Sequence, residues 1–261
     1  MILNKIVENK KKKLIEIKKN KDFSRVKSDG IALAEFDRFK FNSTIKRINN
    51  ISFICEIKKA SPSKGIISEN FDHRSLIVEY EEASADALSI LTETDFFMGS
   101  DNYLIDAKKI TNIPLLRKDF IIDEYQIYES KTIGADAILL IVSLLERVQL
   151  SDYLKIADEL GLSVLVETRN KKEIDIALEA DAKIIGVNNR DLMDFSVNIS
   201  NGLKLKEFVP DDKIFVAESG FRSREDVIMY EKAGADAILI GEHLMKSDDK
   251  FEFLSRLRGD K

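Results

Sequence analysis

Eight short apolar runs recur along the chain from residue 51 onward. Each is rich in Ile, Leu and Val and alternates little between polar and apolar positions, which is typical of strands buried on both faces of a parallel sheet. The runs are residues 51–57, 87–91, 113–116, 137–142, 163–167, 184–187, 214–218 and 237–240. Apolar residues at helical spacing fill the segments between them. These segments predict helices over 75–84, 122–133, 148–160, 171–180, 202–208 and 224–233.

Four near-copies of one short sequence support this alternation. Each follows a predicted helix and opens a predicted strand; they are Ser-Ala-Asp-Ala-Leu (84–88), Gly-Ala-Asp-Ala-Ile (134–138), Ala-Asp-Ala-Lys-Ile (180–184) and Gly-Ala-Asp-Ala-Ile (234–238). The copies are about two strand–helix units apart, so we expect their aspartates to mark the second, fourth, sixth and eighth strands in phase. We also expect Gly134 and Gly234 to end helices. Eight strand–helix units in one domain predict the α/β class, as a (β/α)8 TIM barrel.

Residues 1–47 differ from the rest of the chain. Apolar residues recur there at helical spacing among many lysines, and Ser28-Asp29-Gly30 predicts a break. The run from Lys10 to Lys13 is interpreted as a solvated helix face, with nucleic-acid binding as the alternative. A second amphipathic segment, 36–48, leads into the first strand. We therefore predict a helical extension, residues 1–47, packed on a barrel catalytic domain, residues 48–261.

Composition narrows the possible functions. The 261 residues are 44% hydrophobic and 33% charged, with a formal net charge of −5. These values indicate a large buried core and no general attraction to nucleic acid or to an anionic membrane. With one cysteine and two histidines, a Cys/His zinc site is not indicated, and Cys55 is interpreted as a buried core thiol. No apolar run approaches the ~20 residues that span a bilayer, and the first residues lack a secretory signal, so we expect a cytoplasmic protein.

Charged and amide side chains end most of the predicted strands. In a TIM barrel these ends form the active-site face, so we expect the following side chains to meet there: Glu56, Lys58, Glu93, Arg117, Lys118, Glu167, Asn188, Arg190, Glu218 and Glu242. A salt bridge at the rim would explain any one of them, but the set favours a polyionic active site in which neighbours shift one another's pKa values. Small residues in Ser219-Gly220 and Gly241-Glu242 lie where this fold binds phosphate. The sequence has no metal-binding cluster or nucleotide-cofactor motif, so we expect acid–base chemistry without a metal or cofactor.

The strand-end motifs resemble those of the indole-3-glycerol-phosphate synthase family of tryptophan biosynthesis. The resemblance covers nearly the whole chain and rests on residues 56–65 (EIKKASPSKG), 91–94 with 97–100 (LTET and FMGS), 116–120 (LRKDF), 166–167 (VE), 186–192 (GVNNRDL), 217–220 (AESG) and 239–245 (LIGEHLM). The N-terminal extension is also similar. The chain departs from the family at Ala60, where a basic residue is frequent.

This resemblance implies an activity and a role for each residue. The implied reaction closes 1-(2-carboxyphenylamino)-1-deoxyribulose 5-phosphate to indole-3-glycerol phosphate with loss of carbon dioxide and water. Lys118 is expected to be the general acid for ring closure. Glu56, Lys58 and Glu167 are expected to share the proton transfers of dehydration, in a division that the sequence leaves open.

The same resemblance implies the contacts that bind the substrate. Arg190 with Asn188 matches the substrate carboxylate, and Glu218 is expected to orient a hydroxyl or a lysine. The other expected contacts are with the aromatic ring (Pro62, Phe97, Phe120 and Leu192) and with the phosphate (Ser61, Ser219, Gly220, Gly241 and the backbone of Glu242).

Two other functions stay open at this stage. A related barrel isomerase, such as phosphoribosylanthranilate isomerase, would act on a phosphoribosyl amine with an acid–base pair, often Cys and Asp, but Cys55 is out of phase with that role. A barrel without catalysis could bind a phosphorylated ligand or serve as a scaffold. The expected partner is a phosphorylated small molecule, with no nucleic acid and no membrane, and we expect a monomer or a weak homodimer.

Overall fold

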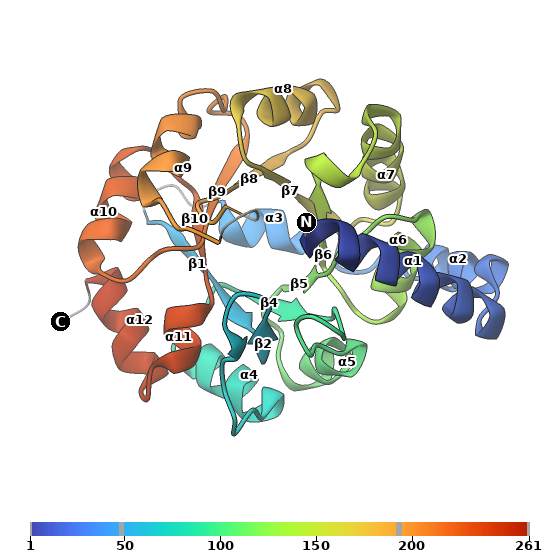
Figure 1. The fold of residues 1–261 in the computed structure, drawn as a ribbon, viewed down its shortest axis with the longest axis horizontal. Coiled ribbons are helices and arrows are strands. Elements are labelled where there is room, and N and C mark those ends of the chain that lie inside the picture. Colours follow the sequence, from blue (N-terminus) through green and yellow to red (C-terminus); the bar gives the residue numbers. More distant parts are fainter. Residues whose placement is uncertain (1, 47–49, 192–194, 260–261) are drawn as a thin grey trace.

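Eight parallel strands close into a barrel, which confirms the predicted (β/α)8 TIM-barrel fold (Figure 1). The computed structural model describes residues 2–46, 50–191 and 195–259. The strands are Ser52–Ile57 (β1), Ala87–Leu91 (β4), Leu115–Lys118 (β5), Ala137–Ile141 (β6), Ser163–Thr168 (β7), Ile184–Asn188 (β8), Ile214–Glu218 (β9) and Ala237–Ile240 (β10). Each strand pairs with the next along this series, and β10 pairs with β1 to close the ring.

All eight predicted strands are present, with ends that differ from the prediction by about two residues at most. The largest difference is at β5, which begins after Pro114. Proline has no N–H to donate to the strand ladder, so regular pairing begins at the residue after it, although the carbonyl of Pro114 accepts the N–H of Leu88 in β4. An antiparallel hairpin of Ala60–Ser61 (β2) and Gly65–Ile66 (β3), which was not predicted, forms in the loop after β1.

Helices alternate with the strands and cover the outside of the barrel (Figure 1). They are His73–Glu82 (α4), Asp101–Ile110 (α5), Glu124–Thr132 (α6), Arg147–Glu159 (α7), Lys171–Glu179 (α8), Ile199–Lys206 (α9), Arg224–Lys232 (α10), Glu242–Lys246 (α11) and Lys250–Arg258 (α12), with a 3-10 turn at Val142–Leu144 (η1). Helix α9 begins earlier than predicted because the side chain of Asn198 caps it by accepting the N–H of Ser200. Among the described residues, no helix has the length and apolar content needed to cross a membrane.

Three helices precede the barrel: Ile2–Asn20 (α1), Phe23–Ala32 (α2) and Lys40–Ile45 (α3). The predicted break at residues 28–30 is wrong, because α2 runs through them and the chain turns at Asp22, whose side chain caps α2. Gly30 serves packing instead of a turn. A Cβ at this position would lie 3.1 Å from the carbonyl oxygen of Tyr128 in α6, so glycine lets the two helices approach closely.

Helix α3 seals one end of the barrel. Phe41 and Ile45 are fully buried in the barrel interior. They share one cluster with inward-facing strand residues that include Ile54, Leu116, Leu139, Leu165, Val216 and Leu239. The backbone N–H of Asn42 also donates to the hydroxyl of Ser163, the first residue of β7. Helix α3 therefore closes the end where the strands begin, opposite the end that carries the charged strand ends.

Three aspartates of the sequence repeat fasten neighbouring strands together. Asp86, Asp136 and Asp236 accept the backbone N–H of Phe53, Leu115 and Phe215, at 2.8 to 2.9 Å. Each aspartate also donates its own N–H to the carbonyl of the same residue. The repeat is therefore a structural clamp at the sealed end of the barrel, far from the charged strand ends.

The copy at residues 180–184 does not have this clamp, so the expectation of four aspartates in phase is wrong. Asp181 has φ 61° and occupies the left-handed position that Gly134 and Gly234 fill in their copies. Lys183 then takes the place of the clamping aspartate: its carbonyl accepts the N–H of Ile214, as the carbonyl of Asp236 accepts that of Ser52. Asp181 instead pairs with lysines at the surface.

This difference between copies gives a matched test. We expect Asp136→Asn to lower the free energy of unfolding by about 1–3 kcal/mol, because a buried N–H and the ammonium of Lys108 lose their charged acceptor. The same change at exposed Asp181 should cost less than about 0.5 kcal/mol, since asparagine tolerates the left-handed backbone. Urea denaturation of both variants measures the two effects. Equal losses would contradict the clamp.

Candidate active site

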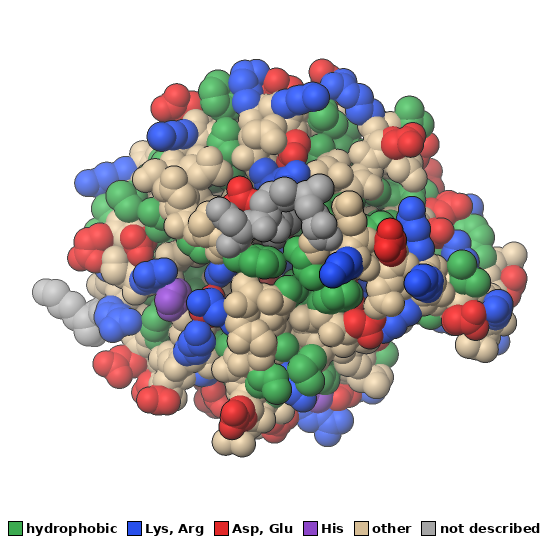
Figure 2. Space-filling model, viewed as in Figure 1, with side chains coloured by type: hydrophobic (Ala, Val, Ile, Leu, Met, Phe, Trp, Pro, Cys, Tyr) green, Lys and Arg blue, Asp and Glu red, His purple; other side chains and the backbone are tan. Residues whose placement is uncertain are grey.

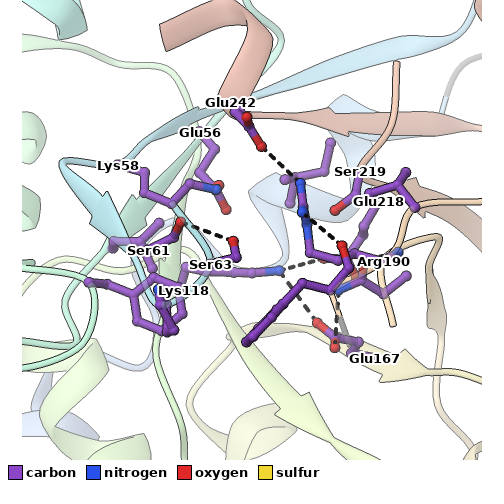
Figure 3. A pocket seen from close by; sticks show the side chains of 18 of the residues that line it. Glu56, Lys58, Ser61, Ser63, Lys118, Glu167, Arg190, Glu218, Ser219 and Glu242 are labelled. Carbon is purple, nitrogen blue, oxygen red and sulfur yellow. Dashed lines mark hydrogen bonds and ion pairs between the residues drawn. The ribbon is translucent and has the colours of Figure 1, made fainter. Parts of the chain in front are cut away.

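A cavity of about 480 Å³ opens where the strands end. It is lined by nearly all the residues that the sequence assigns to the site: Glu56, Lys58, Ser61, Pro62, Phe97, Lys118, Phe120, Glu167, Asn188, Arg190, Glu218, Ser219, Gly220, Gly241 and Glu242. The charged members converge from different strands onto the same space (Figure 3). Leu192 lies outside the described residues.

Lys118 extends from the end of β5 to two carboxylates. Its ammonium forms a hydrogen bond with Glu218 and lies 3.6 Å from the carboxylate of Glu167 (Figure 3). Burial on its own would lower the pKa of Lys118, but the charges of Glu218, Glu167 and Glu56 outweigh it and raise the pKa above its ordinary value. Lys118 is therefore a cation at neutral pH, with its proton held inside the cavity.

Glu218, on β9, is the carboxylate that most readily takes a proton. Burial, together with the negative charges of Glu167 and Glu56, raises the pKa of Glu218 to about 7, against the opposing effect of Lys118. Its Oε1 is buried and has no hydrogen-bond partner among the described residues. A Cβ at Gly186 on β8 would lie 2.6 Å from this oxygen, so the carboxylate occupies space that only a glycine leaves.

Glu56 and Lys58 form an ion pair on the inward face of β1. Burial would raise the pKa of Glu56, but Lys58 and Lys118 have the larger combined effect and lower it. A side chain at Gly241 would collide with this carboxylate and with the ammonium of Lys58. The cavity thus holds one glutamate, Glu56, that stays ionised and another, Glu218, that titrates near neutral pH.

Arg190 lies just after the end of β8 and lines the cavity. Its guanidinium is 3.0 Å from the carboxylate of Glu242, and its backbone N–H donates to the side chain of Asn188. Glu242 also pairs with Lys246 at 2.9 Å and with Lys64 at 3.7 Å. Despite partial burial, these cations lower the pKa of Glu242 to about 2. The carboxylate of Glu242 thus holds three cationic side chains near the loops that the sequence assigns to phosphate binding.

The turn after β9 is held from behind by Asn189. Ser219 and Gly220 both have left-handed backbones, with φ of 70° and 98°. The side chain of Asn189 donates to the carbonyl of Ser219 and accepts from the N–H of Gly202 and the hydroxyl of Tyr230. Asn189 was not predicted as a site residue. The available signal in the sequence was its amide side chain, placed between the predicted site residues Asn188 and Arg190.

Two residues expected in the cavity lie behind it. Glu93 turns its carboxylate to the backbone N–H groups of Asp95, Phe96 and Phe97, and so shapes the loop after β4. This loop presents the ring of Phe97 to that of Phe120, with 5.9 Å between the ring centroids. Arg117 is buried between the barrel and its helices, because successive strand residues face opposite sides.

Helix α1 supplies cavity residues that the sequence did not reveal. Ile2, Leu3 and Ile6 line the cavity, and α1 begins over the centre of the ring of strands and runs outward (Figure 1). His243 also lines the cavity, and burial with nearby arginines and lysines lowers its pKa. Within the part of the chain that the structure describes, no three His, Cys, Asp or Glu side chains are grouped to hold a metal ion.

Comparison with known proteins gives consistent matches. The model of the family described as indole-3-glycerol phosphate synthase matches residues 3–257. A protein named indole-3-glycerol phosphate synthase from Ruminiclostridium cellulolyticum is 51% identical over 99% of this chain and 99% of its own length. A protein of the same name from Endomicrobium trichonymphae is 47% identical over 99% of this chain and 100% of its own length. Among solved structures, 3-hexulose-6-phosphate synthase from Salmonella typhimurium has a TM-score of 0.65 at 14% identity, covering 80% of this chain and 97% of its own, which supports the fold.

The two glutamates with opposite pKa shifts predict different effects of pH on stability. The pKa of Glu218 in the folded state, about 7, lies above its ordinary value of 4.5. Folding is then coupled to proton uptake, so the stability from Glu218 is complete below pH 4.5 and is lost as pH rises to 7. The wild-type protein should therefore lose unfolding free energy between pH 5 and pH 8. In Glu218→Gln we expect this loss to be smaller, by on the order of 1–3 kcal/mol.

Glu242→Gln is the matched control. Because the folded-state pKa of Glu242 is lowered to about 2, its contribution is lost only as pH falls below 4.5. Urea denaturation at pH 5, 6.5 and 8 should therefore give the wild-type slope for this variant. Identical slopes for wild type and Glu218→Gln would show that Glu218 does not titrate in this range.

Proposed function

Because the chain belongs to the indole-3-glycerol phosphate synthase family, we propose a role for each residue of its cavity in that reaction. The enzyme is a decarboxylating lyase of tryptophan biosynthesis. It converts 1-(2-carboxyphenylamino)-1-deoxyribulose 5-phosphate to indole-3-glycerol phosphate, carbon dioxide and water. The observation that carries the residue assignments is the position of Lys118 between Glu167 and Glu218, facing the cavity.

Lys118 is the general acid of ring closure. The ring carbon that bears the carboxylate attacks the ketone carbon, and the ketone oxygen gains negative charge as the new bond forms. A largely buried ammonium stabilises that charge and donates its proton, and carbon dioxide then leaves to restore the aromatic ring. The carboxylates of Glu167 and Glu218 support this role because they keep Lys118 protonated and aimed at one point.

Glu167, Glu56 and Lys58 carry the proton transfers of dehydration. This step removes a proton from the carbon next to nitrogen and protonates the departing hydroxyl, which leaves as water. It needs a base and an acid on the same two carbons. The Glu56–Lys58 pair and Glu167, which accepts from the amide of Asn188, line the same cavity as Lys118. Glu218 orients Lys118 through their hydrogen bond.

The substrate's two anionic groups bind to separate parts of the cavity. Arg190 and Asn188 bind the carboxylate, which takes the place that Glu242 has at the guanidinium without substrate. The hydroxyl of Ser61 and the backbones of Ser219, Gly220, Gly241 and Glu242 hold the phosphate. The aromatic ring packs against Pro62, Phe97, Phe120 and Leu192.

The same proposal covers the setting of the enzyme. It acts in the cytoplasm as a monomer or weak homodimer, and its partner is the phosphorylated substrate, with no nucleic acid and no membrane. Acidic and basic side chains are interspersed over the face that carries the cavity (Figure 2), which suits a small anionic ligand better than a polyanion. Residues 1–47 form the extension packed on the barrel of 48–261, with the boundary at residues outside the described ones.

Lys118→Ala tests the general acid. We expect the rate of indole-3-glycerol phosphate formation, followed by its fluorescence, to fall ~10²- to 10⁴-fold while the protein stays folded. Lys109→Ala, which removes an exposed lysine of α5, is the control and should keep the wild-type rate. Wild-type turnover by Lys118→Ala would remove Lys118 from the mechanism.

Arg190→Lys tests the carboxylate site. A lysine keeps the charge but loses the planar pair of donors, so we expect KM to rise on the order of tenfold with a smaller change in kcat. A competitive inhibitor that is the substrate without its ring carboxylate provides the control, because it should bind wild type and variant equally well. If the variant loses affinity for both molecules to the same extent, Arg190 does not bind this carboxylate.

A further inference from the structure

Helix α1 carries a lysine in the middle of its buried face. Ile6, Lys10 and Leu14 are spaced by four residues and so lie on one side of the helix, and all three are buried. Lys10 is 8% exposed, whereas Lys11 and Lys12 face solvent. The interpretation of Lys10 to Lys13 as one solvated face therefore fails for Lys10. A buried ammonium must have a partner, and its partner lies on the barrel.

Lys10 pairs with Asp119, the residue that follows Lys118. Its ammonium is 2.6 Å from the Asp119 carboxylate, whose side chain is 1% exposed. The same carboxylate accepts the hydroxyl of Thr92 at 2.9 Å and the backbone N–H of Phe120 at 2.8 Å. Burial would raise the pKa of Asp119, but Lys10 and then Arg117 lower it, so Asp119 is ionised.

Asp119 cannot rely on Arg117 alone. Arg117 is 3.6 Å from Asp119, but it lies 3.0 Å from both Asp101 and Glu129. This side of the strand thus holds three carboxylates against one guanidinium, and Lys10 supplies the second positive charge. This concentration of negative charge affects Glu129. Burial and the charge of Asp101 raise the pKa of Glu129, although Arg117 opposes the shift.

The other ionic contacts of α1 with the barrel are exposed. Lys13 pairs with Asp95 and Lys18 pairs with Asp123, each with more than a third of the lysine side chain in solvent. Figure 2 shows Lys and Arg side chains along the segment where Figure 1 places α1. Exposed pairs contribute little because water and salt screen them. Among these three pairs, Lys10 is the one able to fix α1 against the strand ends.

We propose that Lys10 is a positioning residue for the reaction: it balances Asp119 and thereby fixes the directions of Lys118 and Phe120 on either side. The three residues are consecutive, so a displaced Asp119 moves the backbone that carries both cavity side chains. The ammonium of Lys118 would then no longer point between Glu167 and Glu218, and the ring of Phe120 would lose its contact with the ring of Phe97. The inference rests on the proposed role of Lys118 as general acid.

Lys10→Met tests the proposal, because methionine fills similar space without charge. We expect kcat to fall about 10- to 100-fold, as for a catalytic group that is slightly misplaced, with KM changed less than about threefold. Lys10→Arg should recover most of kcat, since it restores the charge. Lys12→Met makes the same substitution at an exposed position of α1 and should keep the wild-type kcat and KM.

A second variant covers the case in which Lys10→Met does not fold. In Lys10→Met/Asp119→Asn no buried carboxylate is left without its cation. The amide oxygen can replace only one of the two carboxylate oxygens that accept from Thr92 and Phe120, and the ionic tie to α1 is gone, so position 119 is held less firmly than in wild type. This variant should fold and still show the reduced kcat. A wild-type kcat in either folded variant, or a higher KM alone, would overturn the proposal and make α1 a simple cover.

The outcome is separate from that of the general acid. If Lys118→Ala is inactive and Lys10→Met keeps a wild-type kcat, the role of Lys118 stands and the inference about Lys10 fails. If Lys118→Ala keeps wild-type turnover, both fail. Reduced turnover in both variants, with recovery in Lys10→Arg, supports both.

Discussion

The structure depends on how ionised side chains are compensated where they leave water. An unpaired charge buried in a protein costs several kcal/mol, so each must find a partner of opposite sign. Around the end of β5 this produces two groups of charges on opposite sides of the strand. Lys118 faces the cavity with Glu167 and Glu218, and Arg117 and Asp119 face the helices. Alternation along one strand therefore links the reacting groups to the network that holds them.

Glycines make the cavity side of this arrangement possible. Glu218 leans over Gly186 of the preceding strand, and Glu56 leans over Gly241 in the same way. Neither glycine has a left-handed backbone, so space for a carboxylate is the reason that a side chain is excluded. The two carboxylates then lie deep enough for burial and neighbouring charges to separate their pKa values, which provides one ionised group and one that titrates near neutral pH.

The sequence predicts what depends on local pattern. Strand positions follow from apolar runs, and the rule that TIM-barrel sites lie at strand ends brings Lys118 and Glu167 to one cavity without any coordinates. It does not say which way a strand-end residue turns, so Glu93 and Arg117 were placed wrongly. Nor does it show that Gly30 serves helix packing or that Lys183 replaces an aspartate of the repeat. The contact of Lys10 with Asp119 joins distant segments, and such a contact has no local signal.

The charge on α1 follows from the needs of the strand end. Thr92 and the N–H of Phe120 point at one buried position, and an acceptor compact enough to serve both is a carboxylate. Asp119 fills that role, but its charge then requires a cation, and Arg117 is shared with Asp101 and Glu129. Burying a methionine at position 10 would cost less free energy than burying a lysine, but Asp119 would then lack its nearest cation. The ammonium comes instead from a helix outside the barrel, so the segment that covers the cavity also completes the charge balance beneath Lys118.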